Sequence, residues 1–258
     1  MTAELLPDGA DGPDGPDLVA EAVTVERAGR RVLDGVGLRA HAGQVLAVTG
    51  PSGSGKSTLL AVLGGLVRPQ AGSVSWRGEP VRVADARPGR ALGVVLQRYG
   101  LLPALSAREN VQLPLQIAKR PRPEVLLRAA AALEQAGLGE DQLPHDRLAE
   151  ELSGGQLQRV AVARALVVEP DLLLADEPSS ELDAATRDVV LAALRAVADR
   201  GGVVVLATHD PEVAAICDAQ VVLADGRVAA DGAGSAGGVE DDPTRDDGAQ
   251  AAGGRHAG

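Results

Sequence analysis

The sequence predicts an α/β protein in which a mostly parallel sheet is covered by helices. Short apolar runs alternate with longer helical patterns along the chain, and this alternation is typical of parallel sheets. Strands are expected at 44–49, 172–175 and 203–207, and a last pair at 219–223 and 227–230 is joined by the turn Asp225-Gly226.

Two further regions complete this prediction. Residues 18–40 and 73–85 alternate apolar and polar positions between Gly and Pro, so they predict a small antiparallel sheet. The pattern from about 103 to 165 is helical, and 124–136 is its clearest amphipathic run.

Composition limits the classes of partner. The chain has no Phe, one Trp and one Tyr among 258 residues, so aliphatic side chains must build its core. Residues 1–17 carry five acids and no base, and 231–258 carry six acids and two arginines, so most of the net charge of −11 lies in tails expected to be disordered. The remaining body is nearly neutral, which gives no support for a nucleic-acid partner.

The single cysteine, Cys217, excludes a disulfide within the chain and a cysteine-rich metal site, and is expected to be a small buried residue. The N-terminus lacks the pattern of a secretory signal, and no apolar run is long enough to cross a bilayer. A soluble, cytoplasmic location is therefore expected.

A glycine-rich stretch follows the first predicted parallel strand. It reads Gly50, Pro51, Ser52, Gly53, Ser54, Gly55, Lys56, Ser57 and Thr58. The glycines allow consecutive N–H groups to face phosphate oxygens, Lys56 adds a full positive charge, and the Ser57 hydroxyl can ligate Mg²⁺. An ordinary Gly-rich turn is the alternative, but the strand before and the aliphatic helix after favour a phosphate site.

Two acids end the strand at 172–175. Asp176 at the end of a buried strand needs compensation, and a Mg²⁺ ion shared with Ser57 would supply it. Glu177 could then polarise the water that attacks the γ-phosphate. The alternative is a capping or turn pair before Pro178.

A second helix start also contains glycines. Ser153, Gly154, Gly155 and Gln156 fit a capping box, which explains the Ser and the Gln. It leaves unexplained the two glycines, each of which costs up to about 1 kcal/mol in a helix relative to Ala. Bare backbone there is expected if an anion approaches closely.

Together with Asp183 and the sequence Thr208-His209-Asp210, these stretches resemble the nucleotide-binding domain of an ABC ATPase over residues 18–230. The resemblance implies a P-loop NTPase fold with a RecA-like core, a small antiparallel β subdomain and an inserted helical subdomain at about 98–165. It also implies two copies paired head to tail, each helix start at 153–156 meeting the ATP held by the other copy. Gln97 then lies near Mg²⁺ and the water, and His209 bonds the γ-phosphate.

The segment 96–115 narrows the resemblance to ATPases of macrolide-export and lipoprotein-release transporters. This implies a subunit that hydrolyses ATP on the cytoplasmic face of the membrane and drives a separate integral membrane permease. Tyr99, Leu101, Leu102 and Pro103 are candidates for the docking groove, or else form core of the helical subdomain. An ABC ATPase that acts on cell-wall enzymes or cofactor assembly is the alternative.

Two departures from the family carry expectations of their own. Arg27 or Ala28 stands where an aromatic residue usually stacks on adenine, so comparable use of GTP and ATP is expected. Glu181 adds a negative charge near the expected dimer interface. The remaining histidines, His41, His145 and His256, match nothing and are expected on the surface or in loops.

Overall fold

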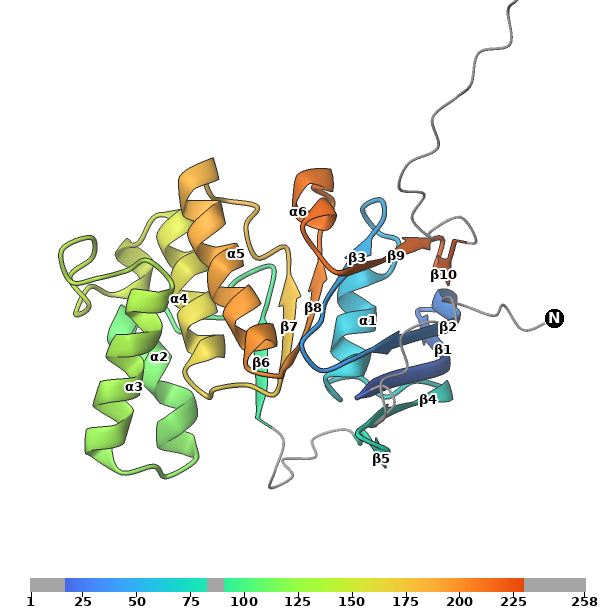
Figure 1. Cartoon of the computed structure of the whole chain (residues 1–258), viewed down its shortest axis with the longest axis horizontal. Helices are drawn as coiled ribbons and strands as arrows, with labels where there is room; N and C mark the ends of the chain where they lie inside the picture. The colour runs from blue at the N-terminus through green and yellow to red at the C-terminus, as the bar shows by residue number, and fades with distance from the viewer. Residues whose placement is uncertain (1–16, 83–90, 230–258) are drawn as a thin grey trace, which may run out of the picture.

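The computed structural model describes residues 17–82 and 91–229, arranged as two sheets and a set of helices (Figure 1). Apart from Asp17, the predicted acidic tails lie outside the described residues. The antiparallel sheet has the order β2-β1-β4-β5. Its strands are β1 (Leu18–Arg27), β2 (Arg30–Ala40), β4 (Ala71–Trp76) and β5 (Glu79–Pro80).

The central sheet has the order β10-β9-β3-β8-β7-β6. Its strands are β3 (Val45–Thr49), β6 (Leu92–Val95), β7 (Leu172–Asp176), β8 (Val203–Ala207), β9 (Ala219–Ala224) and β10 (Arg227–Val228). All neighbours are parallel except β10, which pairs antiparallel with β9. The predicted parallel core and the final hairpin are confirmed, although β10 is shorter than expected and Ala230 lies outside the described residues.

The sequence analysis missed β6. This strand has only four residues, and it pairs with β7 alone at the edge of the sheet. Its short apolar run, Leu92 to Val95, was the available signal, because runs of this length read equally well as strand or buried helix.

The helices surround the central sheet. They are α1 (Lys56–Leu63), α2 (Ala107–Ile117), α3 (Arg122–Gln135), α4 (Gly154–Leu166), α5 (Ala184–Asp199) and α6 (Pro211–Ala215), with a 3₁₀ turn at Ala149–Glu151. The helical region expected between about 103 and 165 is thus built from α2, α3 and α4. Among the described residues, none of these helices combines the length and the apolar character needed to cross a membrane.

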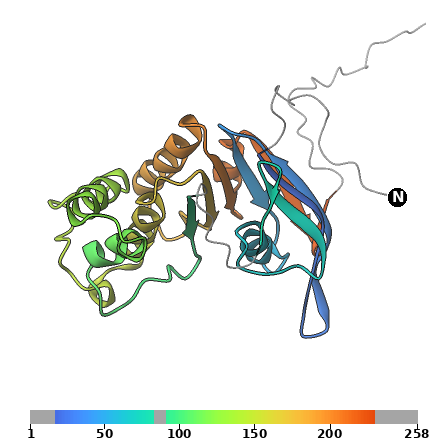
Figure 2. The same cartoon turned by 90° about the horizontal axis from the view of Figure 1, so that it is seen from below.

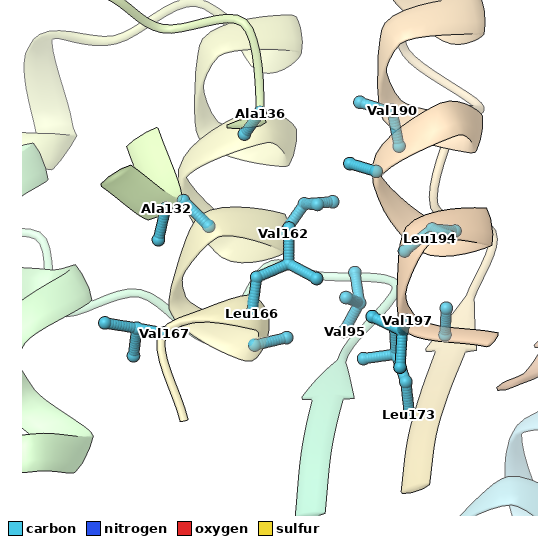
Figure 3. Packing of buried hydrophobic residues seen from close by; sticks show 14 of the residues in the cluster. Val95, Ala132, Ala136, Val162, Leu166, Val167, Leu173, Val190, Leu194 and Val197 are labelled. Carbon is cyan, nitrogen blue, oxygen red and sulfur yellow. The ribbon is translucent and has the colours of Figure 1, made fainter. Parts of the chain in front are cut away.

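Alternation along the buried strands divides the apolar interior in two. On β3, Val45 and Ala47 face one layer while Leu46 and Val48 face the other. The helix-side core packs α2 to α5 against one face; it includes Val95, Val162, Leu166, Leu173, Leu194 and Val197 (Figure 3). The α1-side core lies between α1 and the antiparallel sheet on the other face; it includes Leu18, Leu33, Val48, Leu59, Val74 and Trp76. Figure 2, seen from below, shows the helices α2 to α5 on one side of the central sheet and α1 with the antiparallel sheet on the other.

Trp76 ends β4 and is 6% exposed within the α1-side core. The guanidinium of Arg77 lies 5.1 Å from the centre of its ring, and Arg77 Nε donates to Asp17 Oδ1 at 2.7 Å. The only tryptophan of the chain is therefore fixed between the sheet and a salt bridge.

The structure shows how far Cys217 and the unassigned histidines are buried. Cys217 is half-buried against the helix-side core, and burial together with the charge of Asp218 raises its pKa to about 11. His145 lies in a turn, which fits the expectation of a surface or loop position, although its side chain is only 4% exposed. Its ring is held between Leu138 O at 2.6 Å from Nε2 and Glu140 Oε1 at 3.0 Å from Nδ1. His41 lies in a partly buried loop, and His256 lies outside the described residues.

Candidate active site

The predicted site residues other than 153–156 lie together at one edge of the central sheet. Gly50 directly follows β3, and Asp176 ends β7. Gln97 and His209 each come two residues after the last residue of β6 and of β8. Parallel strands present their carboxyl ends at the same edge, which is where α/β proteins bind ligands. The topology therefore brings together four segments that are far apart in the sequence.

An open cleft of about 560 Å³ lies at this edge. Its walls are Val32, Ser52, Gly53, Gly55, Lys56, Ser57, Thr58, Gln97, Asp176, Glu177, Ser180, Glu181 and His209. Of these, Val32, Ser180 and Glu181 were not among the site residues expected from the sequence, although Glu181 was expected near the dimer interface. Gly50, Pro51 and Ser54 support the loop without lining the cleft.

The loop before α1 needs its glycines for backbone reasons. Gly50, Gly53 and Gly55 have φ values of 137°, 79° and 109°, which residues with a side chain rarely adopt. A Cβ on Gly50 would also lie 2.0 Å from Leu223 O. No side chain caps α1 at Gly55, so the N–H groups of its first turn can serve an anion.

Lys56 and Ser54 lie within the same loop. Lys56 Nζ donates to Gly50 O at 2.7 Å and to Pro51 O at 3.1 Å, so the ammonium bridges the loop while lining the cleft. Ser54 is 4% exposed, and its Oγ has no hydrogen-bond partner within the described part of the chain. The loop thus gathers one charged donor and a buried hydroxyl beside the helix start.

The two acids after β7 differ in their surroundings. Asp176 is 8% exposed, and in residues 17–82 and 91–229 no hydrogen bond or ion pair to its carboxylate is found. Glu177 is equally buried, and its Oε1 lies 2.8 Å from His209 Nδ1. Asp176 is therefore free to bind a cation, whereas Glu177 is paired.

Glu177 also has an unusual backbone. Its φ of 50° lies in the left-handed region, a conformation that costs a non-glycine residue about 1–3 kcal/mol and that recurs at functional sites. Its N–H donates to Ala207 O at 2.9 Å, and Ser180 Oγ donates to its carbonyl at 3.3 Å. Part of the alternative turn interpretation is thus correct, but the turn presents the carboxylate to the cleft.

The start of α4 is built differently from that of α1. Ser153 Oγ accepts from Gln156 N at 3.4 Å, and Gln156 Oε1 accepts from Ser153 N at 3.0 Å, which confirms the capping box. A Cβ on Gly155 would lie 3.1 Å from Glu181 O. Close packing within the chain therefore explains in part why position 155 is a glycine. A Cβ on Gly154 would meet only ordinary contacts, 3.4 Å or more from Glu181 and Tyr99.

Ser153, Gly154, Gly155 and Gln156 do not line the cleft. Gln158, one turn further along α4, is fully buried and donates through Nε2 to Glu177 O at 3.2 Å. The sequence analysis missed Gln158, because nothing in the pattern of an amphipathic helix distinguishes it. Only the folded structure, which brings α4 next to the residue after β7, reveals the contact.

The residues after Gln97 were expected either to form a docking groove or to belong to the core of the helical subdomain, and the structure shows some of each. Leu101 is partly buried and packs against the helix-side core, whereas Leu102 is 47% exposed and Pro103 is exposed. Tyr99 is held through its carbonyl by Arg164 Nη2 at 2.6 Å. Burial, and to a lesser extent the negative charge of Glu181, raise the pKa of its hydroxyl.

Arg27 and Ala28, which stand where an aromatic residue usually stacks on adenine, are exposed. Arg27 ends β1 and Ala28 follows it in the turn, and neither lines the cleft, although Val32 on the next strand does. The expected weak discrimination between ATP and GTP remains a prediction.

A glycine loop with a lysine, a serine at a helix start and two acids ending a parallel strand define a P-loop nucleotide triphosphatase. The family model described as ABC transporter matches residues 33–180. The chain belongs to the ABC transporter family. It is an ATP-binding subunit of the kind that hydrolyses ATP in such transporters. No finding supports the alternative of a non-transport ABC ATPase.

Similar proteins share this assignment. The lipoprotein-releasing system ATP-binding protein LolD of Anaeromyxobacter dehalogenans is 48% identical over 208 residues, covering 78% of this chain and 86% of LolD. The macrolide export ATP-binding/permease protein MacB of Rhodospirillum rubrum is 44% identical over 207 residues, covering 78% of this chain. The match spans only 31% of the length of MacB.

Solved structures agree on the fold. The dimeric structure of the ATP-binding cassette MJ0796 in a post-hydrolysis state, bound to ADP and Pi, has a TM-score of 0.74 and 33% identity. It covers 82% of this chain and 96% of that one. An Atm1-family ABC exporter with ATP bound has a TM-score of 0.72, covering 85% of this chain and 40% of that one.

Proposed function

We propose that two copies of this chain close head to tail around two ATP molecules and drive a separate integral membrane permease of export or lipoprotein-release type. The proposal places the chain at the cytoplasmic face of the membrane, bound to the permease. One observation carries it: the cleft of one chain lacks the second helix start, because residues 153–156 are not among the residues that line it. An ATP molecule in the cleft is then completed by Ser153, Gly154, Gly155 and Gln156 of another copy.

Within one cleft, the loop at 50–58 binds the phosphates. Its N–H groups and the first turn of α1 face the anion, and Lys56 exchanges its bonds with loop carbonyls for bonds with phosphate oxygens. The uncapped start of α1 supports this role, since its donors are not used by a side chain of the loop.

The donors present suit Mg²⁺. The hydroxyl of Ser57, the carboxylate of Asp176 and the amide oxygen of Gln97 are hard oxygen ligands, and all three residues line the cleft. Among the described residues no group of three His, Cys, Asp or Glu side chains could hold a metal by itself, so phosphate oxygens would complete the ligand set. When bound, the ion neutralises charge on the phosphates.

Glu177 is the proposed general base for the attacking water. Its carboxylate faces the cleft, and a proton on His209 Nδ1 would hold it in position at 2.8 Å. General-base assistance is worth about 10²–10⁴-fold in rate. His209 is 68% exposed at its side chain, so it can also reach a phosphate oxygen when a nucleotide and a second copy close the cleft.

The permease is proposed as a separate chain. The LolD relative is named as the ATP-binding protein of its system, and this chain matches 86% of its length. Exposed Leu102 and Pro103, between the Gln97 segment and α2, are the proposed contact with the permease, while Leu101 belongs to the core.

Replacing Glu177 with Gln tests the role of the carboxylate. The variant keeps the shape of the side chain but cannot accept the proton, so turnover should fall at least about 10²-fold while ATP still binds. ATP should also trap the dimer, measured by analytical ultracentrifugation with ATP and Mg²⁺. Normal hydrolysis by Glu177→Gln would assign the base elsewhere.

A mixing experiment tests pairing between copies. A Lys56→Ala chain and a Ser153→Arg chain are each expected to be inactive alone. Mixed together they should form dimers with one intact site, which joins the cleft of the second chain to the α4 start of the first. Failure to recover any activity, with mixed dimers present, would contradict a site shared between chains.

A further inference from the structure

We propose that Gln158 positions Glu177 and so links each α4 to the active site of its own chain. This inference rests on the proposed function, because it assumes that Glu177 activates water and that α4 begins at the ATP of the partner. It assigns a role to a residue within α4 that does not contact the phosphate at the start of the helix but supports the backbone of Glu177.

The hydrogen bonding of Gln158 is incomplete for a packing residue. Its side chain is fully buried, Nε2 donates to Glu177 O at 3.2 Å, and Oε1 has no partner among the described residues. A buried amide that satisfies only half of its capacity weakens the folded state relative to an apolar side chain of the same size. Stability alone therefore gives no reason for Gln at this position.

The bond ends on a residue whose backbone needs support. Glu177 has a left-handed backbone with φ 50°, and such a residue persists only where its surroundings hold it. Ala207 on β8 accepts from its N–H, Ser180 in the following loop donates to its carbonyl, and Gln158 donates to the same carbonyl from α4. Loss of the Gln158 bond leaves the carbonyl to Ser180 alone, so the backbone that aims the carboxylate at the cleft is held less firmly.

The position of Gln158 on α4 connects two sites. It lies four residues beyond Gly154, one turn along the same rigid face of the helix. In the proposed dimer the N-terminus of α4 meets the phosphate held by the partner. A shift of α4 on closure is then transmitted through Gln158 to Glu177 of the same chain, so occupancy of one ATP site adjusts the base of the other.

Gln158→Met is the test, because Met fills a similar volume and removes the donor. The turnover number should fall at least about tenfold, since the base is misplaced. The KM for ATP should stay within about twofold because no phosphate-binding residue changes. The melting temperature should not fall, and the Hill coefficient for ATP should approach one.

Gln112→Met is the matched control. Gln112 is also buried, on α2, where its Oε1 accepts from Gln116 Nε2 at 3.2 Å. It does not line the cleft, so its turnover and Hill coefficient should match those of the unchanged chain. Turnover of Gln158→Met within twofold of the unchanged chain would overturn the inference.

The mixed dimer separates positioning within a chain from damage to α4. Its one intact site uses Glu177 of the Ser153→Arg chain and the α4 start of the Lys56→Ala chain. Adding Gln158→Met to the Ser153→Arg chain should reduce activity at least about tenfold, whereas adding it to the Lys56→Ala chain should leave activity within twofold. Equal losses from both placements would overturn the inference, while normal activity of Glu177→Gln would instead overturn the proposed function.

Discussion

The starts of α1 and α4 both contain glycines, but for different physical reasons. At α1 the backbone itself demands glycine, because Gly50, Gly53 and Gly55 have positive φ and a Cβ on Gly50 would lie 2.0 Å from Leu223 O. At α4 a complete capping box surrounds Gly154, whose φ is not in the positive range and whose missing Cβ has ordinary space. The first start is shaped by its own fold, and the second leaves room for something outside the chain.

The largest expected effect comes from Gly50→Ala. The new methyl would meet Leu223 O, and the φ of 137° is strained for alanine, so the free energy of unfolding should fall by about 3 kcal/mol or more. Urea unfolding of the purified chain measures this. A variant as stable as the unchanged chain would show that the loop can relax and would weaken the comparison.

Gly154→Ala should have the opposite profile. Alanine is a better helix former by up to about 1 kcal/mol, so the free energy of unfolding should stay the same or rise. ATP hydrolysis should nevertheless fall at least about tenfold, because the methyl group stands where a phosphate of the partner is expected to approach. Full activity of this variant, measured by phosphate release, would mean that no close anion contact exists at this position.

The start of α5 differs from those of α1 and α4 because its cap is a titratable side chain, and the expected effect on stability is smaller. Asp183 caps α5 by accepting from Thr186 N at 3.0 Å, and that bond lowers its pKa below the usual 3.8. Because the folded-state pKa is depressed, the stabilisation is present above about pH 3.8 and is lost as pH falls through the lower folded value.

Asp183→Asn retains an acceptor for the cap but cannot titrate. Its free energy of unfolding should therefore depend less on pH between 5 and 2 than that of the unchanged chain, by a small amount because the group is exposed. The caps of α4 are a serine and a glutamine, so Ser153→Asn should leave the pH dependence unaltered. Identical acid profiles for Asp183→Asn and the unchanged chain would contradict the assignment of this cap.

The fold was largely predictable from the sequence because its central parallel strands are mostly apolar. β7 and β8 are buried at every position, which makes them conspicuous. β6 was not predicted because it is only four residues long, lies at the edge of the sheet, and has two residues that are only partly buried. A strand of this kind is fixed by its pairing with β7 rather than by its own pattern.

For the candidate site, residue types and order predicted the phosphate loop and both acids, because their chemistry is tied to chain direction and strand ends. Gln158 and His145 could not be predicted in the same way. Each is a polar side chain in a helical or turn segment, and its burial depends on tertiary packing: Gln158 contacts Glu177, directly after β7, and His145 contacts Leu138.

The isolation of Trp76 in the α1-side core makes it a natural optical reporter. Its emission follows the antiparallel sheet, whereas far-ultraviolet circular dichroism is dominated by helices that mostly belong to the helix-side core. Comparing the two signals during denaturation would reveal whether both halves melt as one cooperative unit or in sequence.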